Sequence, residues 1–357
     1  MKRKNQVTII FIAAFFLVLS LWTILGRTPD YSDSERRVLA SLPELNVENV
    51  LRGEFAEDFD TYATERFPAR DMWRSIKAYA QTRIFGQKDN NGIYTAVGHI
   101  SKMEYPENYD MAGHAIQVFD KVNEIYLQEN DIYLAVIPDK NRYLAEESGH
   151  LEMDYEAFSE YVKEEMEYAQ YIEIADLLEA DDYYYTDTHW KQEKIVDVAE
   201  RIAGEMGVGL DSDYEVHQLE QPFEGVYVGQ SALKCEPDVI HYLSNDAIEQ
   251  AIVTGAKSVY DMEKAKGKDP YEMFLSGNQS VITIKTPLND SGKRLVVFRD
   301  SFGSSIAPLW IEMYSEIVLV DLRYISSDKL GEYVEFKEAD VLFLYSTMML
   351  NNSMGMK

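Results

Sequence analysis

The chain has 357 residues, a net charge of −28, 46% apolar residues and a single cysteine, Cys235. Its length allows one large domain with an accessory segment, or two domains, and its apolar content excludes wholesale disorder. Four of its 34 cations precede residue 28, which leaves 30 cations against 62 acids and a net charge of −32 beyond that point. A body this acidic repels phosphate backbones, so no nucleic-acid partner is expected. A lone cysteine excludes an internal disulfide, a zinc finger and a CxxC redox site.

The first 27 residues predict a cytoplasmic tip and a transmembrane anchor. Residues 7–25 carry no charge and, at ~1.5 Å per residue, cover about one bilayer core as a helix. Lys2, Arg3 and Lys4 precede this run, whereas only Arg27 follows it closely, so the N-terminus is expected in the cytoplasm and the body outside. The alternative is a cleaved signal peptide, which has a shorter apolar core and a small-x-small site. We favour the anchor, and either reading gives an extracytoplasmic body.

Residues 28–86 predict a tether followed by a helical segment. Phe55, Phe59 and Tyr62 recur at helical spacing, Pro68 interrupts the pattern, and a second helix is expected over 69–84.

Residues 87–357 predict an α/β domain, opened by a turn at 90–92 and a short hairpin. Helices are expected at 111–129, 154–169, 191–206 and 303–314, and strands at 131–137, 281–286, 294–298, 316–320 and 341–345. Residues 172–178 fit either a strand or a turn of helix. This alternation is typical of a parallel sheet flanked by helices and joined by right-handed crossovers.

A candidate nucleophile follows the strand at 294–298. In open parallel sheets, sites lie at the carboxyl ends of the strands. Asp300 and Ser301 occupy this position, where a strand-to-helix turn can expose the serine hydroxyl and nearby N–H groups can stabilise an oxyanion. The alternative is that these residues only cap the helix.

A candidate base is His189, because Asp187 lies two residues before it in a polar loop. An Asp-x-His pair lets one loop supply both a base and the carboxylate that orients it. The alternative is a helix cap beside a surface histidine. Gly277 and Asn278 form a third element, since a glycine permits close backbone approach and an asparagine amide can donate to an oxyanion, although this dipeptide also marks ordinary turns.

Two further strand ends carry polar residues. Arg323 follows the strand at 316–320 and fits either an anionic substrate group or an internal salt bridge, of which we favour the salt bridge. Residues 138–141 follow the strand at 131–137 and either line the same cleft or simply begin a loop. Metal-binding and nucleotide-binding motifs are absent from the sequence, so we expect no metal and no cofactor.

These motifs resemble the elements of SGNH/GDSL hydrolases, with the Asp-His pair before the serine as in the circularly permuted SGNH domains of alginate O-acetylation proteins. More closely, the chain resembles the DHHW protein family of bacterial surface proteins. The matching stretches span nearly the whole chain beyond the anchor: residues 35–40, 67–71, 185–190, 258–261, 274–278, 300–302 and 321–324.

The resemblance implies an SGNH-like fold with Ser301 as nucleophile, His189 as base and Asp187 as its orienting group. It also implies transfer or removal of an O-acyl group, expected to be acetyl, on a cell-surface or exported polysaccharide, with a transferase's acyl donor relayed by a membrane partner. Two departures keep a non-catalytic surface glycan-binding or assembly module as the alternative. Thr188 replaces the second position of the Asp-His-His-Trp motif, and Arg299 stands where a glycine often precedes Asp-Ser.

Overall fold

The structure, a computed structural model, describes residues 2–25, 29–32, 34–210 and 213–357. It divides into two compact units. The N-terminal unit comprises residues 1–91 and 228–234, and the α/β unit comprises residues 92–227 and 235–357. The domain boundaries predicted after residues 27 and 86 stay predictions, and the first of them, with Arg27, lies outside the described residues.

The predicted apolar helix at the N-terminus is confirmed as α1 (Lys2–Leu25). Its segment Lys4–Thr23 has a mean hydropathy of 2.2 and is long and apolar enough to cross a membrane. A signal sequence near the N-terminus can meet the same criterion of length and hydropathy.

The remainder of the N-terminal unit is a short helical array. Its helices are α2 (Val47–Arg52), α3 (Glu54–Glu65) and α4 (Arg70–Tyr79), the last continued by a π-helical turn over Ala80–Ile84. Its short strands are β1 (Tyr31–Ser32), β2 (Arg37–Val38) and β3 (Asp89–Asn90). The helices expected on either side of Pro68 are present, because proline lacks the N–H that a continuous helix needs there.

The α/β unit contains most of the regular structure. Its strands are β4 (Ile93–Ala96), β5 (His99–Lys102), β6 (Ile132–Ile137), β7 (Gln170–Tyr171), β8 (Glu215–Gln218), β9 (His241–Ser244), β10 (Ile252–Thr254), β11 (Val281–Lys285), β12 (Arg294–Arg299), β13 (Glu316–Val320) and β14 (Ala339–Ser346). Its helices are α5 (Tyr109–Tyr126), α6 (Asn141–Ser148), α7 (Tyr155–Glu165), α8 (Val196–Glu205), α10 (Asp246–Glu249), α11 (Gly303–Ile306) and α12 (Thr347–Leu350), while α9 (Val226–Ser231) passes from this unit into the other.

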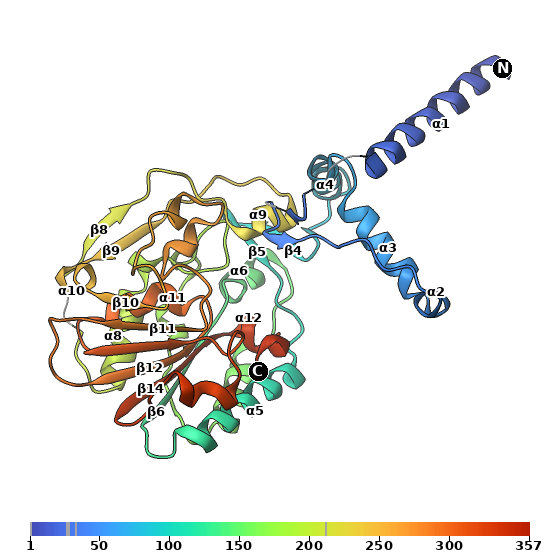
Figure 1. Ribbon diagram of the computed structural model, residues 1–357. Helices are drawn as coiled ribbons and strands as arrows, with labels where there is room; N and C mark the ends of the chain where they lie inside the picture. Colours follow the sequence, from blue (N-terminus) through green and yellow to red (C-terminus); the bar gives the residue numbers. More distant parts are fainter. Residues whose placement is uncertain (1, 26–28, 33, 211–212) are drawn as a thin grey trace. The chain divides into compact units, whose positions relative to one another are not determined.

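The central sheet has seven strands in the order β10-β11-β13-β12-β14-β6-β7 (Figure 1). Strands β13, β12, β14, β6 and β7 run parallel to one another, whereas β11 pairs antiparallel with β13, and β10 pairs antiparallel with β11. The predicted α/β class with a mostly parallel sheet and flanking helices is thus confirmed.

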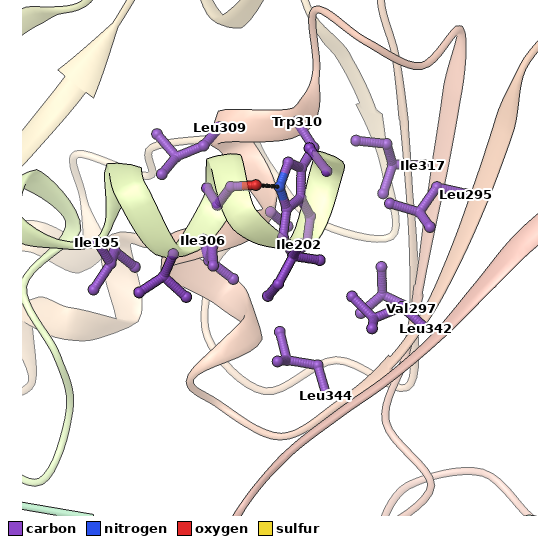
Figure 2. Close-up of a cluster of buried hydrophobic side chains, with 14 of the residues drawn as sticks. Ile195, Ile202, Leu295, Val297, Ile306, Leu309, Trp310, Ile317, Leu342 and Leu344 are labelled. Atoms are coloured by element: carbon purple, nitrogen blue, oxygen red, sulfur yellow. Dashed lines mark hydrogen bonds between the residues drawn. The ribbon is translucent and has the colours of Figure 1, made fainter. Parts of the chain in front are cut away.

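Both faces of this sheet are buried, as expected for parallel strands covered by helices. Leu295 and Val297 of β12 point to the face that packs against α8 and α11, whereas the alternating Val296 and Phe298 pack on the side of α5 and α7. Figure 2 shows the first of these cores, where the indole of Trp310 donates a hydrogen bond to the carbonyl of Ala199 at 3.1 Å. Each fully buried Leu, Ile, Val or Phe contributes roughly 1.5–3 kcal/mol, so these two cores hold the strand ends in place.

Two expected elements are shorter than their sequence patterns predict. The helix expected over 303–314 is α11 followed by a 3₁₀ turn over Ala307–Trp310, because Pro308 lacks the N–H that would continue the α-helix. Residues 172–178 contain a 3₁₀ turn at Ala175–Leu177. The region after Ser301 is therefore a short turn of helix packed into the core.

Candidate active site

Polar residues gather at one edge of the sheet, where four neighbouring parallel strands end. Asp300 and Ser301 follow β12, Asp321 follows β13, Thr347 follows β14 and Asp139 follows β6. The fold thus collects, from segments distant in sequence, the side chains that the sequence places after each apolar run.

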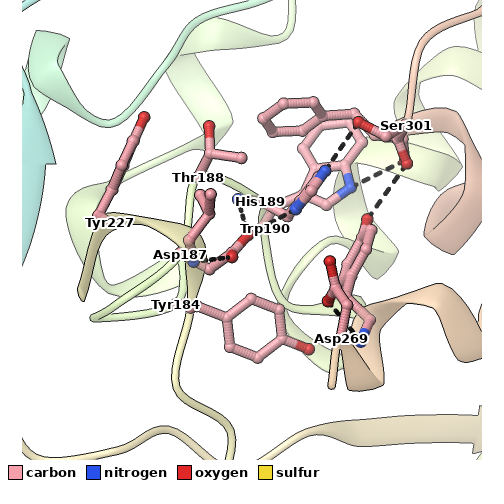
Figure 3. Close-up of polar contacts among 12 residues, drawn as sticks. Tyr184, Asp187, Thr188, His189, Trp190, Tyr227, Asp269 and Ser301 are labelled. Atoms are coloured by element: carbon pink, nitrogen blue, oxygen red, sulfur yellow. Dashed lines mark hydrogen bonds and ion pairs between the residues drawn. The ribbon is translucent and has the colours of Figure 1, made fainter. Parts of the chain in front are cut away.

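The structure brings the three predicted side chains of a Ser-His-Asp arrangement into one hydrogen-bonded chain (Figure 3). The Ser301 Oγ lies 2.8 Å from His189 Nε2. The other ring nitrogen, Nδ1, lies 2.6 Å from Asp187 Oδ1. Their catalytic role stays a prediction, while the contact on which such a role depends is present.

Hydrogen bonds fix the position of the Asp187 carboxylate, which in turn determines the tautomer of the His189 imidazole. It is buried, its Oδ1 also accepts the backbone N–H of His189 at 3.2 Å, and its Oδ2 accepts the N–H of Val226 at 2.8 Å. A carboxylate in this position favours the tautomer that carries its proton on Nδ1. The opposite nitrogen is then free to accept the serine proton.

Aromatic side chains fix the plane of the imidazole. The Tyr271 ring stacks on His189 with centroids 3.8 Å apart and 12° between the planes. The Tyr271 hydroxyl and the Trp190 indole both donate to the Ser305 hydroxyl, at 3.0 Å and 2.9 Å, and the indole also lies 3.2 Å from the carbonyl of Phe302. The histidine loop is thereby attached to the turn that carries Ser301.

A buried lysine holds the same loop from the end of β6. The Lys140 ammonium donates to the backbone carbonyls of Tyr184 and Tyr185, at 2.8 Å and 3.2 Å. Burial lowers the pKa of Lys140 to about 7, although the nearby carboxylates of Asp187 and Asp238 raise it. Residues 138–141 therefore do more than begin a loop, since they contact the strand-end network directly.

Asp238 completes the support of this loop. Its carboxylate accepts the N–H groups of Tyr185 and Thr186, at 2.7 Å and 2.8 Å, together with the Thr186 hydroxyl. The backbone at Gly225 passes so close that a Cβ there would lie 2.3 Å from the Thr186 carbonyl oxygen and 2.4 Å from the Asp187 nitrogen. Only a glycine fits this approach without displacing the loop.

The predicted oxyanion donors differ in whether their N–H groups already have a hydrogen-bond partner. The N–H of Ser301 makes no hydrogen bond within the part of the chain that the structure describes, so it can donate to a ligand. Gly277 has a positive φ of 79°, and its N–H donates to the carbonyl of Phe274 at 3.2 Å. Asn278 is exposed, on the loop before β11, and is not hydrogen-bonded to Ser301 among the described residues. The roles of Gly277 and Asn278 as donors stay predictions.

Two arginines flank Asp321 beside the site. Arg323 forms a bidentate pair with the Asp321 carboxylate, at 2.8 Å and 2.6 Å, so it takes the internal salt bridge that we favoured. Arg299 is buried, and its Nη1 lies 3.7 Å from the same carboxylate. The turn makes room for Arg299 at Gly303, where a Cβ would lie 2.6 Å from the Arg299 Cβ.

Two residues beside the motif have structural partners. Asp300 accepts the N–H and the hydroxyl of Ser346, at 2.9 Å and 2.7 Å, and thus ties the end of β12 to the end of β14. Thr188, at the departure from the family motif, directs its hydroxyl to the Met348 sulfur at 3.0 Å. Within residues 2–25, 29–32, 34–210 and 213–357, no group of three His, Cys, Asp or Glu side chains could hold a metal ion.

Sequence reasoning missed four supports of the site: Lys140, Asp238, Gly225 and Tyr271. Only Lys140 had a signal, its place shortly after a buried strand, where residues 138–141 fitted either the lining of the same cleft or the start of a loop. The other three lie in segments of mixed pattern, and their importance comes from tertiary contact.

No family model matches the chain, and no curated protein matches it. Several solved structures have a similar fold. A DHHW family protein from Eubacterium siraeum has a TM-score of 0.60 at 21% identity, covering 75% of this chain and 95% of that one. PatB1 of Bacillus cereus, in a structure with a sulfonyl adduct, has a TM-score of 0.56 at 18% identity, covering 72% and 95%. The O-acetyltransferase domain of Pseudomonas putida AlgJ has a TM-score of 0.45 at 12% identity, covering 73% and 92%.

The similarities to the DHHW family protein and to PatB1, both with TM-scores above 0.5, confirm the resemblance inferred from the sequence at the level of the fold. The chain has an SGNH-like α/β architecture similar to that of a DHHW family protein, preceded by an apolar helix. At these identities the shared fold does not carry over an activity, so the chemistry has to be argued from the residues themselves.

Proposed function

We propose that the chain is an extracytoplasmic SGNH-like enzyme that transfers an O-acyl group, expected to be acetyl, to a cell-surface or exported polysaccharide, or removes it. The observation that carries this proposal is the continuous contact from Asp187 through His189 to Ser301, on a strand-to-helix turn at the carboxyl edge of the sheet.

In the first half-reaction, His189 Nε2 takes the proton of the Ser301 hydroxyl while Oγ attacks the carbonyl carbon of the acyl donor. The resulting imidazolium is stabilised by Asp187, which remains ionised. The imidazolium then gives its proton to the departing alkoxide oxygen as the bond between that oxygen and the carbonyl carbon breaks. An acyl-serine and a free alcohol result.

In the second half-reaction, His189 takes the proton of an acceptor hydroxyl as its oxygen attacks the carbonyl carbon of the acyl-serine. The imidazolium then returns this proton to Ser301 Oγ as the bond between Oγ and the carbonyl carbon breaks. A sugar hydroxyl as acceptor makes the enzyme a transferase, and water makes it an esterase. The Ser301 N–H is the oxyanion donor that the geometry supports best, with Gly277 or Asn278 as the second. Because the body carries a net charge of −32, a neutral glycan suits it better than a polyanion.

The location of the enzyme forms part of the proposal. With α1 kept as an anchor and its cations in the cytoplasm, the α/β unit lies outside the membrane, where polysaccharide is available. A transferase in this location needs an acyl donor relayed by a membrane partner. Arg323 is held by Asp321 and leaves recognition of the acceptor to other residues.

Turnover of 4-nitrophenyl acetate by the full chain in detergent tests the chemistry. We expect Ser301→Ala and His189→Ala to lower turnover by roughly 10³-fold or more, with the thermal transition unchanged. Equal turnover by the wild type and Ser301→Ala would overturn the assignment of the nucleophile. A folded wild type that turns over neither this ester nor an acetylated oligosaccharide would instead favour the non-catalytic glycan-binding module.

A further inference from the structure

Helix α4 directs two arginines, Arg70 and Arg74, into the N-terminal unit, whereas Asp71 and Lys77 of the same helix are exposed. Arg74 Nη2 donates to the carbonyls of Gly229 and Gln230, at 2.7 Å and 2.8 Å, and lies 3.2 Å from the Glu35 carboxylate. Arg70 Nη1 contacts the same carboxylate at 2.5 Å. Both guanidinium groups are therefore used within the unit, and their face of the helix is the one that packs.

The opposite face of α4 is apolar and exposed. Met72, Trp73, Ile76 and Tyr79 are 52%, 40%, 50% and 64% exposed. Residues 72, 76 and 79 follow the i, i+4, i+7 spacing of a single helix face, with Trp73 beside them. A helix that faces water normally shows the reverse pattern, with its apolar stripe on the core. An exposed apolar face of this kind marks an interaction surface.

Exposed apolar residues continue beyond α4, and exposed Lys and Arg side chains lie beside them. Ile84, the last residue of the π-helical turn, and Phe85, which follows it, are 66% and 74% exposed. Arg83 is exposed next to them, and Lys77 is exposed on α4. Exposed Trp and Tyr beside aliphatic residues, with Lys and Arg at the margin, form the composition of helices that lie in a membrane interface.

The chain brings this surface to a membrane by a short covalent path. Three residues separate Leu25, the end of α1, from Pro29, so these two positions are at most roughly 14 Å apart. The Pro29 carbonyl accepts a hydrogen bond from Arg66 Nη1 at 3.3 Å. Arg66 caps the end of α3 and lies four residues before the start of α4. A bilayer crossed by α1 is therefore the apolar partner that lies nearest along the chain.

We propose that the exposed face formed by Met72, Trp73, Ile76 and Tyr79 docks on the lipid surface of the membrane from which α1 emerges. The side chains enter the boundary between headgroups and acyl chains, and Lys77 and Arg83 face anionic headgroups. The proposal requires α1 to be kept as an anchor, and it is independent of the chemistry at Ser301. Its consequence is that the N-terminal unit is a second membrane contact.

Fluorescence quenching in vesicles tests this docking. The full chain, with Cys235→Ser, is reconstituted into vesicles of phosphatidylcholine and phosphatidylglycerol that contain a lipid with a nitroxide near its headgroup. One cysteine is introduced by Ile76→Cys or, as the matched control on the polar flank of the same helix, by Ser75→Cys, and is labelled with a nitrobenzoxadiazole probe. We expect several-fold stronger quenching at position 76 than at position 75.

Three outcomes would overturn the proposal. Equal quenching at the two positions would show that the exposed face has no preference for lipid. A probe at position 76 that is shielded from water yet unquenched would assign the face to a protein partner. Release of the full chain from vesicles by alkaline carbonate would show that α1 is no anchor. Because both labelled positions are exposed, the thermal transition should equal that of the unlabelled chain, which separates docking from folding.

Discussion

The Tyr271 ring lies flat on the His189 imidazole, with centroids 3.8 Å apart and 12° between the planes. This contact fixes the ring that must meet Ser301 on one side and Asp187 on the other, so it has a catalytic consequence in the proposed mechanism. A stacked pair of this kind contributes about 0.5–1.5 kcal/mol, which corresponds to roughly a 2- to 12-fold change in rate.

Substitution at position 271 separates stacking from hydrogen bonding. Tyr271→Phe keeps the stacked ring and loses the hydroxyl's bond to Ser305 at 3.0 Å and its long bond to the Ser301 carbonyl at 3.4 Å, so we expect turnover of the acetyl ester within about two-fold of the wild type. Tyr271→Ala removes the stack, and we expect kcat to fall by up to about 12-fold. Steady-state kinetics of both variants check this, and equal losses would show that the hydroxyl, rather than the ring, supports the histidine.

Asp187→Asn should remove the carboxylate that orients His189 while keeping the shape of the side chain at position 187. An amide that donates toward Nδ1 selects the tautomer with its proton on Nε2, which cannot accept the serine proton. We expect kcat to fall by about 10³- to 10⁴-fold, with KM little changed. Turnover and thermal unfolding, measured on the same preparation, check this. Retention of a tenth or more of the wild-type kcat would point to a different orienting group.

Lys140→Met should disturb the loop that carries the base, although position 140 does not touch Ser301. The change removes two hydrogen bonds, one to the buried carbonyl of Tyr184 and one to the carbonyl of Tyr185, which still accepts the N–H of Ile100 at 2.7 Å. At about 1–3 kcal/mol for the buried Tyr184 carbonyl left without this donor, we expect lower stability and about a ten-fold loss of kcat. Lys140→Arg, which keeps hydrogen-bond donors at this position, is the control and should recover part of the activity.

The same lysine predicts a pH dependence of stability. Burial lowers the pKa of Lys140 to about 7 in the folded chain from 10.5 as its ordinary value. Between these values the unfolded chain binds the proton more tightly, so the contribution of Lys140 is fully present above about pH 10.5 and is lost as the pH falls to about 7.

The free energy of unfolding of the wild type minus that of Lys140→Met should therefore rise with pH across this window. The slope should not exceed about 1.4 kcal/mol per pH unit. Urea unfolding at a series of pH values between 7 and 10 measures it. A difference that stays flat would contradict a buried lysine with a lowered pKa.

The strand ends and the Ser-His-Asp side chains could be predicted because each belongs to a short local pattern. Apolar runs such as 294–298 become strands buried on both faces, and the residues directly after them are placed at the edge of the sheet by the strand direction alone. Asp187 and His189 share one loop, so their contact depends mainly on local spacing. These features can be predicted because they depend on local sequence and hardly on tertiary contacts.

The supports of the site could not be predicted in the same way. Asp238 and Gly225 lie in a stretch without clear periodicity, and their roles depend on which backbone passes beside them. Tyr271 stacks on His189 only because its turn is held against the core. The helix expected over 303–314 was too long because its apolar periodicity outweighed Pro308, whose missing N–H ends the α-helix early.

The most direct measurement of the central claim is covalent labelling of the folded full chain with phenylmethylsulfonyl fluoride. The Ser301 oxygen would displace fluoride at the sulfonyl sulfur, and peptide mass spectrometry would locate the adduct. The account predicts a single adduct on Ser301, lost in Ser301→Ala and strongly slowed in His189→Ala. A wild type that takes up no sulfonyl group, or carries it on another residue at an equal rate in Ser301→Ala, would contradict the assignment of Ser301 as an activated nucleophile.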